Sequence, residues 1–319
     1  MIVGFSSSHN ANRKLIYESN VPKQVENINP YLVAGEVVFI EARRTPICGV
    51  PVFVRGSQPT DDGNFILTAD EKEAFIAKEP QAEKFIRPFM MGKDFIDRKP
   101  RYCLWLVDAL PQDIRQCPEV MKRVAAVREF RLNSKKPATR KKADTPMLFD
   151  EVKNSKTDYI AVPVVSSENR RYIPVDFLPS EIIAGNKLFT LSEVSLYHFG
   201  VLTSNVHMAW MRVVAGRLKS DYSYSNTVVY NNFPWCNPTD KQRAKIEKTA
   251  QGILDARAKY PDSSLADLYD EVTMPPELRK AHQANDRAVM EAYGFWGRLN
   301  TESECVAELM KMYQHLTTK

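Results

Sequence analysis

Apolar residues recur at helical spacing near the middle of the first half of the chain. Val120, Val124 and Val127 are three or four residues apart, and this spacing places them on one face of a helix. Three basic residues lie off that face: Lys122, Arg123 and Arg131. The pattern predicts an amphipathic helix over Pro118–Leu132, followed by a polar, basic and proline-broken loop over 133–144.

Shorter elements are predicted on the N-terminal side of this helix. A short helix is expected over 68–77, because Thr68 and Glu71 have the spacing of a capping box. Turn clusters at 56–59 and 61–64 separate the neighbouring elements. Three apolar runs are typical of strands: Ile2–Phe5, Val37–Glu41 and Tyr102–Val107.

The second half of the chain changes from strands to helices. Residues 159–235 predict mostly strands and turns, with one helix over His207–Leu218 and a strand-like alternation over Tyr222–Tyr230. After Pro238, three helix-start signals follow: Thr239 or Asp240, Pro275–Glu277, and the capping box Thr301–Glu304. We therefore expect an α+β fold, with a mixed α/β region to about residue 236 and a small helical C-terminal region.

The composition is that of a globular chain without a membrane span. The 319 residues are 44% hydrophobic, enough for a sizeable core. The mean hydropathy is −0.37, and no apolar run approaches the roughly 18 residues that would cross a bilayer. We expect no metal site and a reducing, cytoplasmic location, because five cysteines lack the spacing of zinc ligands or of a disulfide framework: Cys48, Cys103, Cys117, Cys236 and Cys305.

Positive charge is concentrated in one segment. Between Val120 and Lys142 there are nine Lys or Arg residues against a single acid, Glu129, whereas the whole chain carries a net charge of only +5. The remainder of the chain is therefore slightly acidic. A local cationic patch of this kind is typical of a surface that binds a polyanion, and a solvated charged loop is the alternative.

Other motifs have simpler explanations. Residues 27–31 lack the second proline of an amino-methyltransferase catalytic loop and are expected to form a turn. Asp61 and Asp70 fit the spaced acids of a metal nuclease only loosely, so a complete metal-dependent nuclease remains an alternative. His198 and His207 have no ligand-type neighbours at suitable spacing, which favours structural roles.

Lys219 and Asp221 place a donor and an acceptor two residues apart, at the end of the helix predicted over 207–218. Lysine can donate to guanine O6 and N7, and aspartate can accept from cytosine N4, so this pair has the chemistry to read one base pair. From these residues alone, a surface ion pair is the simpler interpretation.

The order of several segments resembles the C-terminal half of the type IIL, MmeI-like restriction–modification enzymes. These enzymes combine a nuclease, an adenine-N6 methyltransferase and target recognition in one chain. The likeness covers nearly the whole sequence, including the stretches 2–5, 27–32, 51–64, 102–106, 128–131, 197–200, 207–210, 216–218, 230–235, 254–257 and 274–278.

The resemblance implies a division of labour. Residues 1–30 would be a methyltransferase remnant and linker, 31–236 a target-recognition domain, and 237–319 a C-terminal helical region. The family's nuclease motif, cofactor loop and catalytic loop lie upstream of these segments. We therefore expect no catalytic residue and no cofactor in this chain, whereas the parent bacterial enzyme would bind S-adenosylmethionine. The partners would be double-stranded DNA and the parent's methyltransferase domain.

The resemblance also implies which residues contact DNA. Lys219 and Asp221 match the pair that reads the base after the methylated adenine, and Lys187 and Ser223 match positions for the base before it. Lysine at 187 favours guanine, so the expected site ends in G-A-G. Phosphate contacts are expected from Arg128, Arg131, Lys135, Lys136, Arg140, Lys141 and Lys142. A structural or protein-interaction fragment with an incidental basic loop is the remaining alternative.

Overall fold

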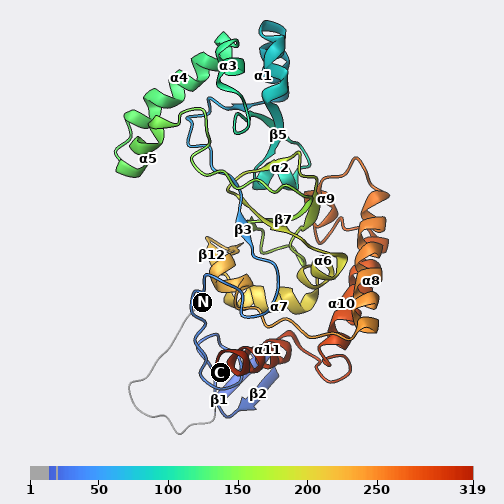
Figure 1. Cartoon of the computed structure of the whole chain (residues 1–319). Helices are drawn as coiled ribbons and strands as arrows, with labels where there is room; N and C mark the ends of the chain where they lie inside the picture. Colours follow the sequence, from blue (N-terminus) through green and yellow to red (C-terminus); the bar gives the residue numbers. More distant parts are fainter. Residues whose placement is uncertain (1–13, 19–20, 319) are drawn as a thin grey trace.

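The computed structural model describes residues 14–18 and 21–318, and it combines helices with four small sheets (Figure 1). The expected α+β fold is confirmed. The strand predicted at Ile2–Phe5 lies outside the described residues. Within the described part of the chain, no helix has the length and apolar character needed to cross a membrane.

An arm projects from one end of the molecule and has its own hydrophobic core. The arm consists of residues 60–90 and 101–150, and its apolar side chains, with Ile183, form a separate buried cluster (Figure 1). Its sheet has the order β10-β5-β6-β4, in which only the β10–β5 pair is parallel. The strands are β4 (Ile66–Leu67), β5 (Ile86–Met90), β6 (Arg101–Leu104) and β10 (Ile183–Ala184).

Helices cover the arm sheet and extend beyond it. Val120, Val124 and Val127 are buried, as the sequence pattern predicted. Glu79 accepts hydrogen bonds from the backbone N–H groups of Glu119 and Val120, both at 3.1 Å, and so caps the start of their helix. The helices are α1 (Ala69–Lys78), α3 (Pro111–Arg115), α4 (Pro118–Leu132) and α5 (Pro137–Lys141), with 3-10 turns at Pro80–Phe85 and Lys142–Asp144.

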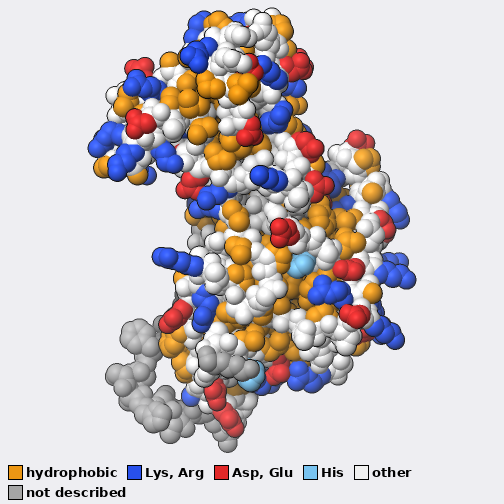
Figure 2. Space-filling model, in the orientation of Figure 1, with side chains coloured by type: hydrophobic (Ala, Val, Ile, Leu, Met, Phe, Trp, Pro, Cys, Tyr) orange, Lys and Arg blue, Asp and Glu red, His pale blue; other side chains and the backbone are white. Residues whose placement is uncertain are grey.

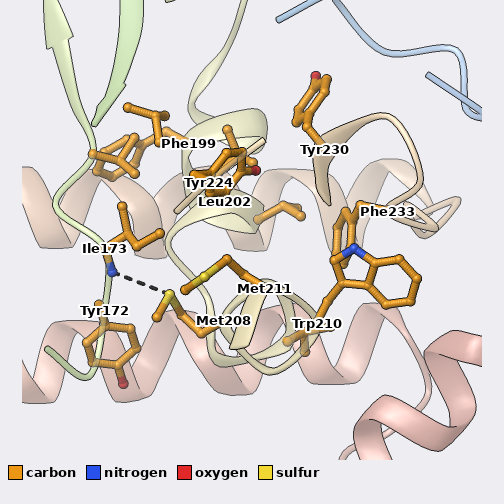
Figure 3. Close-up of a cluster of buried hydrophobic side chains, with 14 of the residues drawn as sticks. Tyr172, Ile173, Phe199, Leu202, Met208, Trp210, Met211, Tyr224, Tyr230 and Phe233 are labelled. Carbon is orange, nitrogen blue, oxygen red and sulfur yellow. Dashed lines mark hydrogen bonds between the residues drawn. The ribbon is translucent and has the colours of Figure 1, made fainter. Parts of the chain in front are cut away.

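The body is built around a second and larger core. Its central sheet is antiparallel, with the order β3-β11-β7-β9. Trp210 of α7 is fully buried in this core (Figure 3). Its indole N–H donates to Val229 O at 3.0 Å. The elements are β3 (Val54–Arg55), β7 (Tyr159–Pro163), β9 (Asp176–Leu178), β11 (Leu188–Ser192), α2 (Gly92–Ile96), α6 (Leu196–Leu202) and α7 (Asn205–Val214).

The C-terminal helices are part of the body core. Gly200 of α6 lies so close to α8 that an added Cβ would be 2.7 Å from the Ile246 side chain. Asn285 of α10 donates to Gly200 O at 2.8 Å, which ties a second helix to the same position. The four helices are α8 (Asp240–Ala258), α9 (Leu265–Leu268), α10 (Pro276–Ala292) and α11 (Glu302–Thr317). The tail therefore braces the body from within one continuous core.

Two smaller sheets complete the fold. A three-stranded antiparallel sheet has the order β12-β13-β8 and comprises β8 (Val165–Ser166), β12 (Gly216–Leu218) and β13 (Asp221–Ser223). A hairpin of β1 (Lys14–Glu18) and β2 (Val21–Val25) lies near α11, where Lys23 pairs with Glu304 at 3.1 Å (Figure 1).

Arm and body meet where two glycines come into contact. An added Cβ on Gly56 would lie 2.4 Å from Gly185 O, and one on Gly185 would lie 2.3 Å from the sulfur of Met91. Only a residue without a side chain allows the backbones to approach this closely. At this point the chain passes from β10 of the arm sheet to β11 of the body sheet through the turn at Asn186–Lys187.

The helix starts predicted from caps are confirmed. Thr68 and Glu71 form the expected capping box, with Thr68 N donating to the Glu71 carboxylate at 2.7 Å. Thr239, Pro276 and Thr301 likewise lie at the starts of α8, α10 and α11.

Several other elements differ from the prediction. The run Val37–Glu41 forms no strand, because Asn and Tyr side chains bind the backbone there: Tyr31 Oη accepts from Ile40 N, and Asn232 Nδ2 donates to Glu41 O. The loop predicted over 133–144 is largely helical. The helix predicted over 207–218 ends at Val214, ahead of Gly216. Tyr222–Tyr230 is strand only to Ser223, and a π-helical turn follows over Asn226–Tyr230.

Candidate nucleic-acid interface

Lys219 and Asp221 lie in a tight β-hairpin and not at a helix end. Leu218 pairs with Asp221 across the hairpin, so Lys219 and Ser220 form its two-residue turn. Lys219 has a φ of 57°, which is the left-handed conformation that such turns need. This hairpin, residues 216–223, is called the reader hairpin below. It projects from the body on the side toward which α5 extends (Figure 1).

Arg217 stiffens the reader hairpin. Its guanidinium lies 3.9 Å from the ring centre of Tyr222 and donates to Ser220 O at 2.8 Å. It also approaches the Glu168 carboxylate to 3.8 Å. These contacts join both strands, the turn and the neighbouring segment through a single side chain, which limits the positions that Lys219 can take.

The pleat of β13 fixes where its side chains point. Tyr222 is only 6% exposed and belongs to the body core. Successive side chains in a strand point to opposite faces, so Asp221 and Ser223 project from the face opposite Tyr222. Both are half-buried, whereas Lys219 at the turn is exposed.

A hollow of about 450 Å³ brings Lys187 and Asp221 together. Lys187 comes from the turn between β10 and β11, and Asp221 comes from the reader hairpin more than thirty residues later. Lys219 and Ser223 are not part of this lining. The sequence analysis did not identify the other polar residues that line the hollow, which are Lys93, Asp97, Ser167 and Arg170. The adjacent pair Arg170–Arg171 was a signal in the sequence that could have found one of them.

Except for Lys122 near the start of α4, the exposed cations of the basic segment gather at the end of the arm, around the C-terminus of α4 and α5 (Figure 2). Arg128, Lys135, Lys136 and Lys141 are exposed. Arg140 is also exposed, and it donates to the carbonyls of Ser134 and Lys135 at 2.8 and 3.1 Å. In the same view the outline of the molecule is indented between this end of the arm and the body (Figure 2).

Two predicted phosphate contacts have roles inside the arm. Arg131 is 0% exposed, and its guanidinium donates to five backbone carbonyls at 2.8 to 3.3 Å, those of Pro59, Thr60, Lys142, Thr145 and Leu148. The prediction that Arg131 binds phosphate is therefore wrong, because every guanidinium nitrogen is turned toward protein. Lys142 is half-buried and lies 3.5 Å from the Asp150 carboxylate, so its charge is partly matched within the arm.

The acids considered for a metal nuclease, and one of the two histidines examined as metal ligands, have structural roles in the fold. Asp61 is buried and accepts from Phe65 N at 2.7 Å, and Asp70 lies in the first turn of α1. His207 contacts Tyr224 Oη at 2.8 Å, and burial lowers its pKa to about 3. Among residues 14–18 and 21–318, no three His, Cys, Asp or Glu residues come close enough to hold a metal ion.

Comparison with known proteins gives a consistent assignment. Residues 34–237 match the family model described as "MmeI, target recognition domain", and residues 238–319 match "MmeI, C-terminal domain". DNA methyltransferase A of Bacillus subtilis (strain 168) is 34% identical over 319 residues, which are 100% of this chain and 36% of that protein.

A solved structure of the type IIL restriction-modification enzyme MmeI in complex with DNA superposes with a TM-score of 0.92. It is 44% identical and covers 98% of this chain, which in turn covers 42% of that one. The chain thus spans less than half the length of either relative. The likeness inferred from the order of the sequence segments is confirmed, and the chain belongs to the MmeI family as a target recognition domain joined to a C-terminal domain.

Proposed function

We propose that this chain is the part of a larger restriction enzyme that recognises a specific sequence in double-stranded DNA. The larger enzyme would methylate adenine at N6. The observation that carries the proposal is the reader hairpin, a rigid turn that presents a donor, Lys219, and an acceptor, Asp221, beside the hollow that Lys187 lines. A relative solved in complex with DNA, which has the same fold over 98% of this chain, supports it.

Two surfaces would divide the task. The cations at the end of the arm would contact phosphates and set the position of the duplex without regard to sequence. Lys187, Lys219, Asp221 and Ser223 would face base edges, where hydrogen bonds discriminate between base pairs. The expected target ends in G-A-G on the strand that is methylated.

The methylation itself would belong to the methyltransferase domain of the parent protein, which would also hold S-adenosylmethionine as methyl donor. The sequence of this chain has no Gly-rich loop of the kind that binds this cofactor, so no chemical step is assigned to its residues. A complete nuclease is not favoured, because Asp61 already binds the backbone of its own turn.

Fluorescence anisotropy with labelled duplexes tests the proposal. We expect the purified chain to bind duplex DNA with an affinity that falls steeply with salt, and the triple change Lys135→Gln, Lys136→Gln, Lys141→Gln to reduce the slope of log K against log salt by about 2 to 3. Three exposed lysines of the C-terminal helices, changed to Gln, form the control with equal charge: Lys241, Lys248 and Lys280. Absence of duplex binding in dilute buffer would overturn the proposal.

A further inference from the structure

Arg170 is fixed next to the candidate base-reading residues. Its backbone N–H donates to Ser167 O at 3.2 Å, which closes a turn after β8. On the other side, Arg171 O accepts from Arg212 at 2.6 Å, and Tyr172 and Ile173 enter the body core (Figure 3). The backbone of Arg170 is therefore anchored both before and after the residue.

The side chain of Arg170 is half-buried in the hollow that Lys187 and Asp221 also line. Burial lowers the pKa of its guanidinium, and the charge of Asp221 opposes this most strongly, followed by those of Asp270 and Asp97. These carboxylates come from the reader hairpin, the segment before α10 and the end of α2. A half-buried guanidinium keeps its charge, so it depends on nearby anions to offset the loss of water.

We propose that Arg170 is a positioning residue for Asp221, and that it decides which charges the reader hairpin accepts at position 221. This inference rests on the proposed function of the hairpin. Both side chains line the same hollow, and attraction between their charges across it would favour the position in which the Asp221 carboxylate presents an acceptor. The same arrangement makes a basic residue at 221 unfavourable, because two cations would share one half-buried site.

The consequence concerns any change of target. Exchanging the polarity of the pair, by Lys219→Glu with Asp221→Arg, is the obvious way to invert the preference for the adjacent base pair. With Arg170 in place, the new arginine is repelled from the position that Asp221 occupies. Adding Arg170→Gln removes this repulsion and keeps a polar, uncharged side chain at the position. We therefore expect the inversion to require the third substitution.

Thermal unfolding without DNA tests the coupling alone. We expect the double exchange to lower the unfolding midpoint by at least about 2 °C, and Arg170→Gln to restore it. The milder Asp221→Asn should lower the midpoint when Arg170 is present and leave it unchanged in a chain that already carries Arg170→Gln. Lys93→Gln, which removes another cation of the hollow, is the control and should not couple to position 221. Additive effects of changes at 170 and 221 would overturn the proposal.

Binding to duplexes that differ only at the base pair after the adenine tests the role in recognition. We expect Arg170→Gln to reduce the preference between them about tenfold, Arg170→Lys to retain it, and the triple variant to invert it. An inverted preference in the double exchange with Arg170 unchanged would contradict the proposal. Loss of duplex binding by every chain, with the coupling in unfolding intact, would overturn the proposed function and leave the charge coupling between Arg170 and Asp221 standing.

Discussion

Arg131 lies within a basic segment but serves the interior of the arm. It occupies α4 four residues after Val127 and so continues the buried stripe of that helix. Its guanidinium donates hydrogen bonds to backbone carbonyls of the 59–60 turn and of residues 142–148. These bonds join α4 to the two segments that flank it. Burial lowers the pKa of Arg131, and the charges of Asp150 and Asp61 oppose the effect.

We expect Arg131→Ala to destabilise the chain by about 3 kcal/mol or more, because several buried carbonyls would lose their partner at once. Arg128→Ala, an exposed position one turn earlier on the same helix, should change stability by less than about 0.5 kcal/mol. Urea unfolding followed by tryptophan fluorescence measures both. Equal stability of the two variants would show that the carbonyl cluster around Arg131 contributes little.

Asp286 couples the C-terminal helices to the body and makes stability depend on pH. Its carboxylate accepts from Tyr172 Oη at 2.6 Å and from Asn205 N at 2.8 Å. Burial raises its pKa from 3.8 to about 6, although both hydrogen bonds and the charges of Arg171 and Arg212 act in the opposite direction. The acid is therefore more easily protonated in the folded chain than in the unfolded chain.

The contribution of Asp286 to stability is fully present below about pH 4 and is lost as the pH rises through about 6, because the folded state then loses a proton it binds more tightly. We expect Asp286→Asn to flatten the stability profile between pH 4 and 7. Unfolding midpoints of both chains across this range provide the measurement. Parallel profiles for the two chains would rule out Asp286 as the titrating group.

At the scale of elements, the side chain of Arg217 links both strands and the turn of the reader hairpin, in addition to the pairing of β13 with β8. We expect Arg217→Ala to reduce discrimination between duplexes by about 3- to 10-fold, with little change in the unfolding midpoint, because the side chain lies at the surface and contacts only the hairpin and the exposed Glu168. Competition binding with matched and mismatched duplexes gives the ratio. A drop in affinity for all duplexes by the same factor would instead indicate a phosphate contact.

Local sequence signals predicted the elements that local forces determine. The cap at Thr68 and the valine stripe of α4 were read correctly, since both depend on residues within one or two turns. The end of α7 and the turn of the reader hairpin were missed because the predicted helix was continued through Gly216. The pairing of β13 with β8 was missed because it connects residues more than fifty positions apart. The position of Lys187 next to Asp221 likewise depends on the turn at Gly185 and on sheet pairing. No spacing rule reports such a contact.

At the scale of the whole molecule, two cores meet at the glycine contact. We expect Gly56→Ala to destabilise the chain by about 1–3 kcal/mol, because the added carbon would meet the rigid backbone of Gly185. Gly252→Ala, in open space within α8, should stabilise the chain by about 0.5–1 kcal/mol. Denaturant midpoints of the two variants should therefore shift in opposite directions, and a neutral Gly56→Ala would show that the junction can relax.

The separate core of the arm affects how this architecture can change over generations. The exposed cations stand on one folded unit, and the residues that would inspect bases stand on another. Under the proposed function, a substitution in the reader hairpin would alter the base preference while leaving the general affinity for nucleic acid unchanged. Proteins with this architecture would then change their target sites in small steps, without passing through forms that no longer bind the double helix.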